Sequence, residues 1–150
     1  MSRRALLLGW LLPLAASAAE SAAPALPGIW KLEMKKFMAS GEMYTEFFPG
    51  GGCEQTARVK LAGITHWAAD RCTWKLENGT LSMTMTASSD ASNKLGAVST
   101  VHVDALKAEA LTVSKDGKAQ DWTRVAQWPD EFAAHKLGAA AAPPAAGEKH

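Results

Sequence analysis

The sequence predicts an all-β protein, an antiparallel meander followed by a short C-terminal helix. Apolar and polar residues alternate through most of residues 28–125, which is the period of a strand with one buried face, and helical periodicity is nearly absent there. Asn78–Gly79 and Asp116–Gly117 are of the kind that best tolerates the two consecutive positive φ angles of a tight hairpin turn. Each dipeptide lies between two alternating segments, so we expect successive strands to pair as hairpins.

The N-terminal segment has the features of a signal peptide. Two arginines precede an apolar run at residues 5–14, and small residues then offer a cleavage site, so residues 1–19 are expected to be removed on export. The apolar run is too short to span a bilayer, and the first cysteine, Cys53, lies far from the cleavage point. The sequence thus predicts a periplasmic or secreted protein without stable membrane insertion. The export route stays open, because residues 2–7 also resemble a twin-arginine signal.

The first strand is expected at residues 30–35, where Trp, Leu and Met alternate with Lys and Glu. A turn around residues 39–41 leads into a second strand at Met43–Phe48, and the Pro and three Gly of residues 49–52 then break the chain. This glycine run lacks the Lys-Ser/Thr continuation of a phosphate-binding loop. We interpret it as a hairpin connection.

The third and fourth strands are placed by the cysteines. Cys53 and Cys72 lie symmetrically about Ala62–Gly63, so a turn at that dipeptide sets them opposite each other and points Thr56 and Arg58 outward. In an exported chain the two cysteines are expected to form a disulfide, which contributes about 3 kcal/mol in the loop-entropy model. The alternative, a reactive or metal-binding thiol pair, lacks a CxxC spacing and a nearby basic group.

The Asn78–Gly79 turn fixes the next register. Trp74 is then opposite Met83, with Met85 beyond it. Residues 78–80 also fit the acceptor pattern for N-glycosylation, but the tight turn accounts for the same residues.

The last strands follow a polar loop at residues 88–96. A strand is expected at Val98–Leu106, and the Asp116–Gly117 turn then sets Leu111 opposite Trp122.

The sequence pattern changes from strand-like to helix-like at Trp128. Pro and acidic residues at the start, a late Lys and a closing Gly predict a short helix at residues 129–138, whose Trp128 and Phe132 would plug one end of the sheet. The patterned hydrophobicity suffices for one domain, residues 28–128, with a linker at 20–27 and a disordered Ala- and Pro-rich tail at 139–150.

The charge of the chain argues against a nucleic-acid partner. It has 16 Lys and Arg against 15 Asp and Glu, and loss of a signal peptide would remove two of the basic residues. A nucleic-acid binder normally has a basic stripe, whereas the cluster of Lys31, Lys35 and Lys36 suits an ordinary solvated strand face.

The order of these segments resembles the small lipocalin-like domains of exported bacterial proteins. The resemblance covers residues 27–125 and rests on Gly28-Ile29-Trp30, TEFFPGG, the TWKLENGTL hairpin and VHVDALKAEALTVSKDGKAQDWTRV. It implies a closed meander barrel of about eight strands, a size whose interior either fills with side chains or holds one small ligand. It also implies a structural contact between Trp30 and Arg124 at the closed end of the barrel.

The candidate ligand-lining residues are those that the predicted pairing turns inward: Trp74, Met83, Met85, Leu111 and Trp122. Their bulk leaves open whether any cavity remains. With Met34 and Met43, the inward methionines are interpreted as core packing, the alternatives being an adaptable lining for an apolar ligand or a soft-metal site for Cu(I).

No catalytic constellation stands out. The four histidines are far apart and lack metal-ligand spacing, no serine lies in a nucleophile-elbow motif, and no acid has a reliably placed partner acid. We therefore expect no enzyme, no metal and no cofactor. The most interesting polar group is His66 with Asp70, alongside Trp67, which are the candidate loop contacts. They form a hydrogen-bonded pair or part of a binding rim, the alternative being a plain exposed hairpin.

Two functions follow as hypotheses. The first is an exported binding module that holds a small apolar ligand or docks an envelope protein. The second is a protein-docking or inhibitor domain with a filled barrel, which uses a loop at residues 64–67 and the loop at 88–96. The sequence leaves the oligomeric state open.

Overall fold

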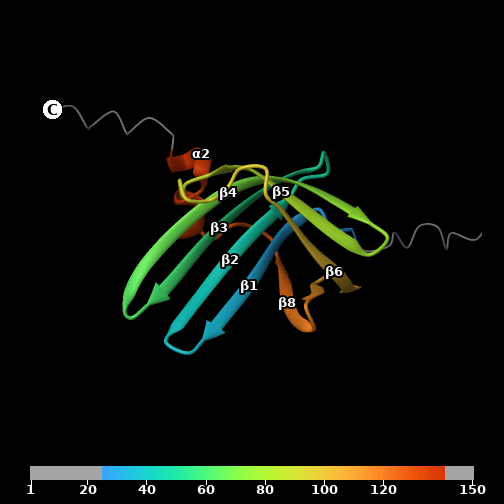
Figure 1. Cartoon of the computed structure of the whole chain (residues 1–150), viewed down its shortest axis with the longest axis horizontal. Coiled ribbons are helices and arrows are strands. Elements are labelled where there is room, and N and C mark those ends of the chain that lie inside the picture. The colour runs from blue at the N-terminus through green and yellow to red at the C-terminus, as the bar shows by residue number, and fades with distance from the viewer. Residues whose placement is uncertain (1–24, 141–150) are drawn as a thin grey trace, which may run out of the picture.

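A computed structural model describes residues 25–140 of the chain (Figure 1). Eight strands form a closed barrel in which each strand pairs with the next and β8 pairs with β1, so the predicted meander barrel is confirmed. The strands are β1 (Gly28–Lys36), β2 (Ala39–Phe47), β3 (Gly52–Leu61), β4 (Ile64–Glu77), β5 (Thr80–Ser88), β6 (Val98–Leu106), β7 (Ala110–Lys115) and β8 (Lys118–Val125). Two short helices follow, α1 (Asp130–Ala134) and α2 (Leu137–Ala140).

Three tight turns set the register of the barrel. Both residues of Ala62–Gly63, Asn78–Gly79 and Asp116–Gly117 have φ angles between 50° and 80°, as hairpin turns of this kind require. The predicted cross-strand pairs follow: Cys53 with Cys72, Trp74 with Met83, and Leu111 with Trp122.

The first hairpin turn lies earlier than predicted. Phe37 and Met38 form it, with Met38 at φ 61°, and β2 begins directly afterwards. The prediction of a turn at residues 39–41 is therefore wrong. Gly41 lies inside β2, where an added Cβ would be 3.2 Å from both the Arg58 carbonyl oxygen and the Met34 methyl carbon. A glycine at this position therefore relieves close packing rather than forming a turn.

The barrel closes through β1 and β8, and Trp30 and Arg124, which are paired across these two strands, stabilise the closure. Trp30 is fully buried, and the guanidinium carbon of Arg124 lies 4.2 Å from the centroid of its indole ring. Arg124 also donates hydrogen bonds to the carbonyl oxygens of Ala25, Pro27 and Ala108, at 2.5 to 2.7 Å.

The three residues before β1 belong to the barrel. Leu26 is only 2% exposed, and its carbonyl oxygen accepts a 2.8 Å hydrogen bond from the Trp30 indole. This end of the segment expected as a linker, residues 20–27, is thus packed into the core. The expected signal peptide, residues 1–19, and the tail from residue 141 onward lie outside the described residues.

The helices cover the outer face of the barrel, with α1 against β3 and α2 against β4 (Figure 1). Phe132 and Trp128 pack on Tyr44, an outward residue of β2, with ring centroids at 4.5 and 6.1 Å. The prediction that they plug one end of the sheet is therefore wrong. The single helix predicted at residues 129–138 is interrupted after α1. Thr56 of β3 faces outward as expected, but it is only 1% exposed.

The predicted disulfide is confirmed. Cys53 and Cys72 are bonded across β3 and β4, with their Cα atoms 4.9 Å apart, and they are the only two cysteines of the chain. Within residues 25–140, neither helix has the length or the apolar character to cross a bilayer.

Candidate functional site

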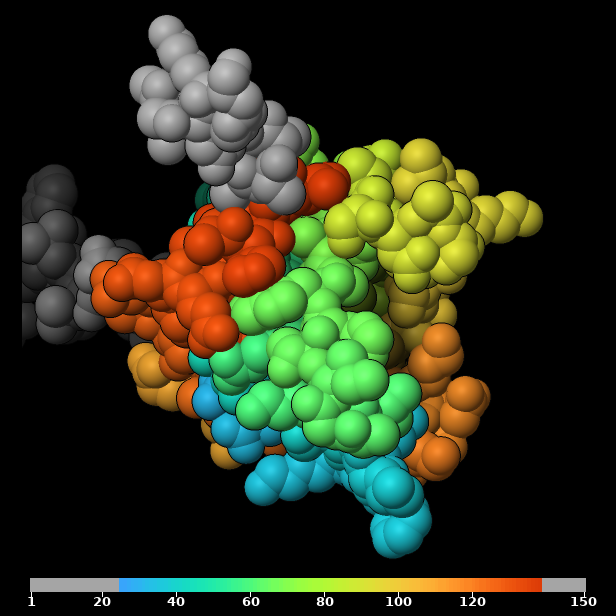
Figure 2. Space-filling model, turned by 90° about the vertical axis from the view of Figure 1, so that its left-hand side faces the viewer, coloured from blue at the N-terminus to red at the C-terminus, as the bar shows by residue number. Residues whose placement is uncertain are grey.

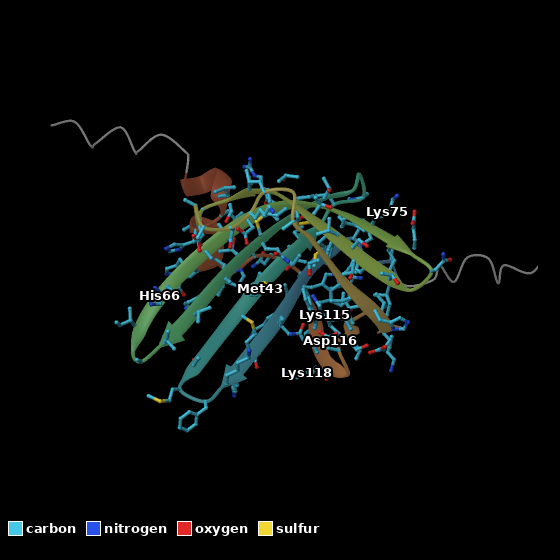
Figure 3. The ribbon with its side chains drawn as sticks, viewed as in Figure 1. Met43, His66, Lys75, Lys115, Asp116 and Lys118 are labelled. Atoms are coloured by element: carbon cyan, nitrogen blue, oxygen red, sulfur yellow. A yellow bond between two sulfur atoms is a disulfide. The ribbon has the colours of Figure 1, made fainter. Side chains whose placement is uncertain are left out.

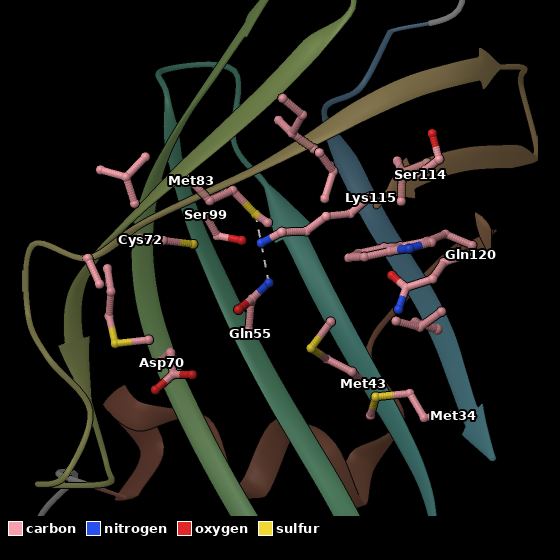
Figure 4. A pocket seen from close by; sticks show the side chains of 18 of the residues that line it. Met34, Met43, Gln55, Asp70, Cys72, Met83, Ser99, Ser114, Lys115 and Gln120 are labelled. Carbon is pink, nitrogen blue, oxygen red and sulfur yellow. Dashed lines mark hydrogen bonds between the residues drawn. The ribbon is translucent and has the colours of Figure 1, made fainter. Parts of the chain in front are cut away.

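The barrel contains a cavity of about 630 Å³ (Figure 4). Its lining comes from all the strands, because the side-chain alternation of each strand turns every second residue toward the barrel axis. The volume lies within the range of small-molecule sites, roughly 300 to 1,000 Å³. The interior is therefore only partly filled by side chains.

Most of the cavity wall is apolar. Four methionines from three strands line it: Met34, Met43, Met83 and Met85. Branched and aromatic residues form much of the remaining apolar wall, among them Leu32, Leu81, Val101, Val113 and Trp122. Because methionine is unbranched and polarisable, such a wall can adapt to ligands of different shape.

A polar stripe crosses the inner wall of β2, β3 and β4. Thr45 is paired with Gln55, and Gln55 with Asp70. The Gln55 amide nitrogen donates to the Thr45 hydroxyl at 3.3 Å and contacts the Met83 sulfur at 3.8 Å (Figure 4). The amide of Gln55 is thereby held in place within an otherwise apolar wall.

Two buried polar atoms of the wall have no hydrogen-bond partner among the described residues. They are Oδ1 of Asp70, an acceptor, and Nε1 of Trp122, a donor. Less than 1 Å² of each atom is exposed, so a ligand in the cavity reaches either atom only if its side chain turns. Leaving such an atom without a partner costs about 1 to 3 kcal/mol, which would favour that turn. Because β4 and β8 are four strands apart in a ring of eight, the two atoms lie on opposite sides of the barrel.

The mouth of the cavity lies at the β7–β8 hairpin and carries two cations. Lys115 and Lys118 flank the turn and line the cavity together with Asp116 (Figure 3). Lys115 extends across the cavity in Figure 4. The β1–β8 pairing runs only from residues 29–32 to residues 122–125, so these two strands separate toward the mouth.

The structure places three of the five expected ligand-lining residues at the cavity: Met83, Met85 and Trp122. Trp74 does not line it, because its ring packs edge-on against Phe47 at 5.7 Å and its indole donates to the Phe48 carbonyl oxygen. Leu111 is fully buried in the core beside the cavity.

The structure separates the residues expected as loop contacts. Residues 64–67 belong to β4, so the loop expected there is a strand. Asp70 lines the cavity, whereas Trp67 lies on the outer face and stacks on His135 at 3.7 Å. His66 is exposed near the β3–β4 turn (Figure 3). The three residues therefore do not form one rim.

Sequence reasoning misses Gln55 as a site residue, although its position gives a signal. Gln55 shares the inward face of β3 with Cys53, and a polar side chain at an inward position of a small barrel has to find a partner inside. Met34 and Met43 are recognised only as an alternative lining. The alternation of the strands predicts that both methionines face inward, but it does not predict how much free volume remains inside the barrel.

The ionisable groups whose pKa the structure shifts lie on the outside of the barrel. Burial raises the pKa of Tyr44, and hydrogen bonds from His102 and Ser114 lower the pKa of Asp104. Within residues 25–140 no three His, Cys, Asp or Glu side chains gather closely enough to hold a metal ion. The described lining of the cavity offers mainly apolar contact and a few hydrogen-bonding groups.

Comparisons with known proteins give no family and two solved structures of limited similarity. No protein-family model matches the chain, and no curated protein matches it. A lipocalin-like protein from Bacteroides uniformis ATCC 8492 matches with a TM-score of 0.49 and 15% identity, over 67% of this chain and 98% of that chain. An uncharacterized protein from Bacteroides eggerthii DSM 20697 matches with a TM-score of 0.47 and 12% identity, over 67% and 100%. The closed eight-stranded barrel is established by the strand pairing itself.

Proposed function

We propose that the protein is an exported binding module that holds one small, largely apolar ligand inside the barrel. The observation that carries this proposal is the cavity of about 630 Å³, with its methionine-rich wall and its two unpartnered polar atoms. An apolar wall with few, well-placed polar groups is the usual composition of a small-molecule site. The ligand is expected to carry a hydrogen-bond donor for Asp70 and an acceptor for Trp122.

The cavity argues against the second hypothesis, a docking or inhibitor domain with a filled barrel. It also supports binding over catalysis. Of the described residues that line it, none is a histidine and the one cysteine, Cys72, is in the disulfide. Neither a Ser-His nor a Cys-His pair can be assembled from that lining.

Export is part of the proposal. The Cys53–Cys72 disulfide supports it, because such bonds persist in oxidising compartments such as the periplasm or the extracellular space. The signal-like segment at residues 1–19 gives the route to such a compartment.

Filling the cavity tests the binding function. Ser99 lines the cavity from β6, whereas the next residue, Thr100, does not, since neighbouring strand residues point to opposite faces. We expect Ser99→Trp to abolish saturable binding of 1-aminoanthracene, a small aromatic probe whose fluorescence rises in apolar surroundings. The measurement is a fluorescence titration of the purified chain.

Thr100→Trp is the matched control, because it adds the same indole on the outer face of the same strand. It should bind the probe as the natural chain does. Binding that survives Ser99→Trp unchanged, or that is absent from the natural chain, contradicts a ligand inside the barrel.

A further inference from the structure

We propose that the tips of the β1–β2 and β3–β4 hairpins form a docking surface for an anionic lipid bilayer. The apolar part of this surface, called the tip patch, consists of Phe37, Met38, Leu61 and Ile64. The proposal does not depend on the occupant of the cavity.

The tip patch is exposed and lies on two neighbouring hairpins. Its four side chains are 94%, 69%, 51% and 61% exposed, in chain order. Strand pairing joins the two turns, because Ala39, which follows the first turn, is paired with Leu61, and Leu61 is paired with Ile64. Large exposed apolar side chains that are clustered in this way mark interaction sites on protein surfaces.

Both tips project from the barrel. In Figure 1 the β1–β2 and β3–β4 turns extend beyond the rest of the sheet at its lower left. Figure 2 looks toward this side of the molecule, with the β1–β2 turn projecting at the bottom. The surface is therefore convex, which suits shallow entry into a bilayer interface better than contact with a flat partner.

Unpaired lysines flank the tip patch. Lys35, Lys36 and Lys60 are exposed, and none of them forms an ion pair with any residue in the range 25–140. The nearby carboxylates are already neutralised, since Glu33 contacts Lys31 at 2.9 Å and Glu42 contacts Arg58 at 3.0 Å. The tips thus present positive charge although the whole chain has a formal charge of only +1.

Further lysines lie at the same end of the barrel. In an up-and-down barrel alternate connections share one end, so the β5–β6 and β7–β8 connections lie at the end of the tip patch. Lys94 lies in the first connection with Asp90, and Lys115 and Lys118 flank the second with Asp116 between them, so lysines outnumber acids here by three to two. The opposite end is different, because there Lys75 contacts Glu77 at 3.3 Å.

This composition favours a bilayer over a protein partner. Lysine is depleted at protein–protein interfaces, whereas basic residues beside exposed apolar side chains are the usual composition of surfaces that bind anionic lipid. Each lysine near an anionic membrane contributes about fivefold to affinity, and the apolar tips add contact with the acyl boundary. Docking in this way would turn the mouth of the cavity toward the membrane.

Co-sedimentation with lipid vesicles tests the docking surface. The full chain should bind vesicles that contain phosphatidylglycerol and phosphatidylcholine, and bind vesicles of phosphatidylcholine alone more weakly. Lys36→Gln combined with Lys60→Gln should reduce affinity for the anionic vesicles by about 25-fold, and Phe37→Ser should reduce it as well. High salt should weaken binding by the natural chain.

Matched variants at the opposite end keep the test specific. Lys75→Gln combined with Lys107→Gln removes two lysines, and Phe48→Ser removes an exposed aromatic ring; both should bind as the natural chain does. All variants share residues 1–24, so a difference in vesicle binding between them is due to the substituted residues at the tips. Equal circular dichroism spectra show that the variants fold. Absence of binding to anionic vesicles, or equal binding by tip and control variants, overturns the proposal and favours a protein partner.

Discussion

Asp70 is the residue on which ligand preference is expected to depend. Its Oδ1 atom is buried in the cavity wall without a partner among the described residues, and Gln55 beside it is already engaged with Thr45. A carboxylate can only accept hydrogen bonds, so we expect the Asp70 side chain, once turned toward the cavity, to favour ligands that bring an N–H or O–H group to β4. Specificity in this cavity then rests on few atoms, while the methionines supply adaptable apolar contact.

Replacing Asp70 by Leu should remove that selection. The natural chain is expected to prefer 1-aminoanthracene to anthracene by about tenfold, because only the amine can donate to the carboxylate. Asp70→Leu should bind the two probes equally. Fluorescence titration with both probes measures the ratio.

Asp121→Leu is the control for this prediction, since Asp121 lies exposed on β8 and accepts a hydrogen bond from Thr112. It should keep the tenfold preference. A preference that persists in Asp70→Leu would show that another group of the wall receives the amine.

Among the elements of the fold, helix α1 shows how a nominally exposed sheet face becomes buried. Phe132 is 2% exposed and packs between Tyr44 of β2 and Trp67 of β4, with ring centroids at 4.5 and 5.1 Å. Arg58 lies over the Phe132 ring and bonds Glu131 at 2.6 Å, which ties the helix to β3. The helix has five residues, so these contacts rather than its own backbone bonds hold it in place.

Phe132→Ala should loosen α1 and expose Tyr44, the only tyrosine of the chain. Burial raises the pKa of Tyr44 above its ordinary value of 10.0 because it disfavours the charged phenolate. In the variant this pKa should fall toward 10.0, and the free energy of unfolding should fall by about 3 kcal/mol. Ultraviolet titration of the phenolate measures the first effect, and urea unfolding the second.

The same burial sets the sign of a pH effect. A group whose pKa is higher in the folded state favours folding below its unfolded pKa, and this contribution is lost as pH rises toward the folded value. The natural chain should therefore lose stability above pH 10.0, and Phe132→Ala should show less of this loss. Phe37→Ala, at an exposed tip, should leave the phenolate titration unchanged; an unchanged titration in Phe132→Ala would contradict the role of α1.

The elements that sequence predicts well are those fixed by local rules. Asn78–Gly79 and Asp116–Gly117 need positive φ at both residues, which few other dipeptides accept, so the strands beside them could be registered without a structure. The turn at Phe37–Met38 has no such chemistry and was missed. The docking of α1 depends on aromatic residues that face outward from β2 and β4. In the sequence these residues look like the ordinary outward positions of a strand, so the docking could not be predicted.

For the whole molecule, closure of the barrel was implied by the resemblance to lipocalin-like domains and agreed with the strand count, but the cavity could not be predicted. The free volume depends on how far side chains such as Trp74 and Leu111 fill the axis. The structure places the first against Phe47 and the second in the core, and both leave the methionine-lined space free. No local sequence pattern distinguishes side chains that fill the barrel axis from side chains that pack beside it.

Removing the disulfide should test how much the covalent link contributes to the whole barrel. Cys53 and Cys72 are separated by 19 positions, and a link across such a loop contributes about 3 kcal/mol by restricting the unfolded chain. Cys53→Ala combined with Cys72→Ala should lower the free energy of unfolding by that amount in urea titrations. The variant should not respond to a reducing agent, whereas the natural chain should; equal unfolding midpoints for the two chains would contradict a stabilising bond.

The contact between Arg124 and the carbonyl oxygen of Ala25 spans 99 positions of sequence, and this separation affects the order in which the barrel folds. The hairpins between neighbouring strands can form as soon as each has emerged, but β1 has to wait for the last strand before it gains its second neighbour. Closing so long a loop is slow, so we expect ring closure to be the final step of folding. Until then the methionine-lined face would be open to solvent. If the chain is exported unfolded with its N-terminus first, as proposed, we expect the cavity to be complete only when nearly all of the chain has crossed the membrane.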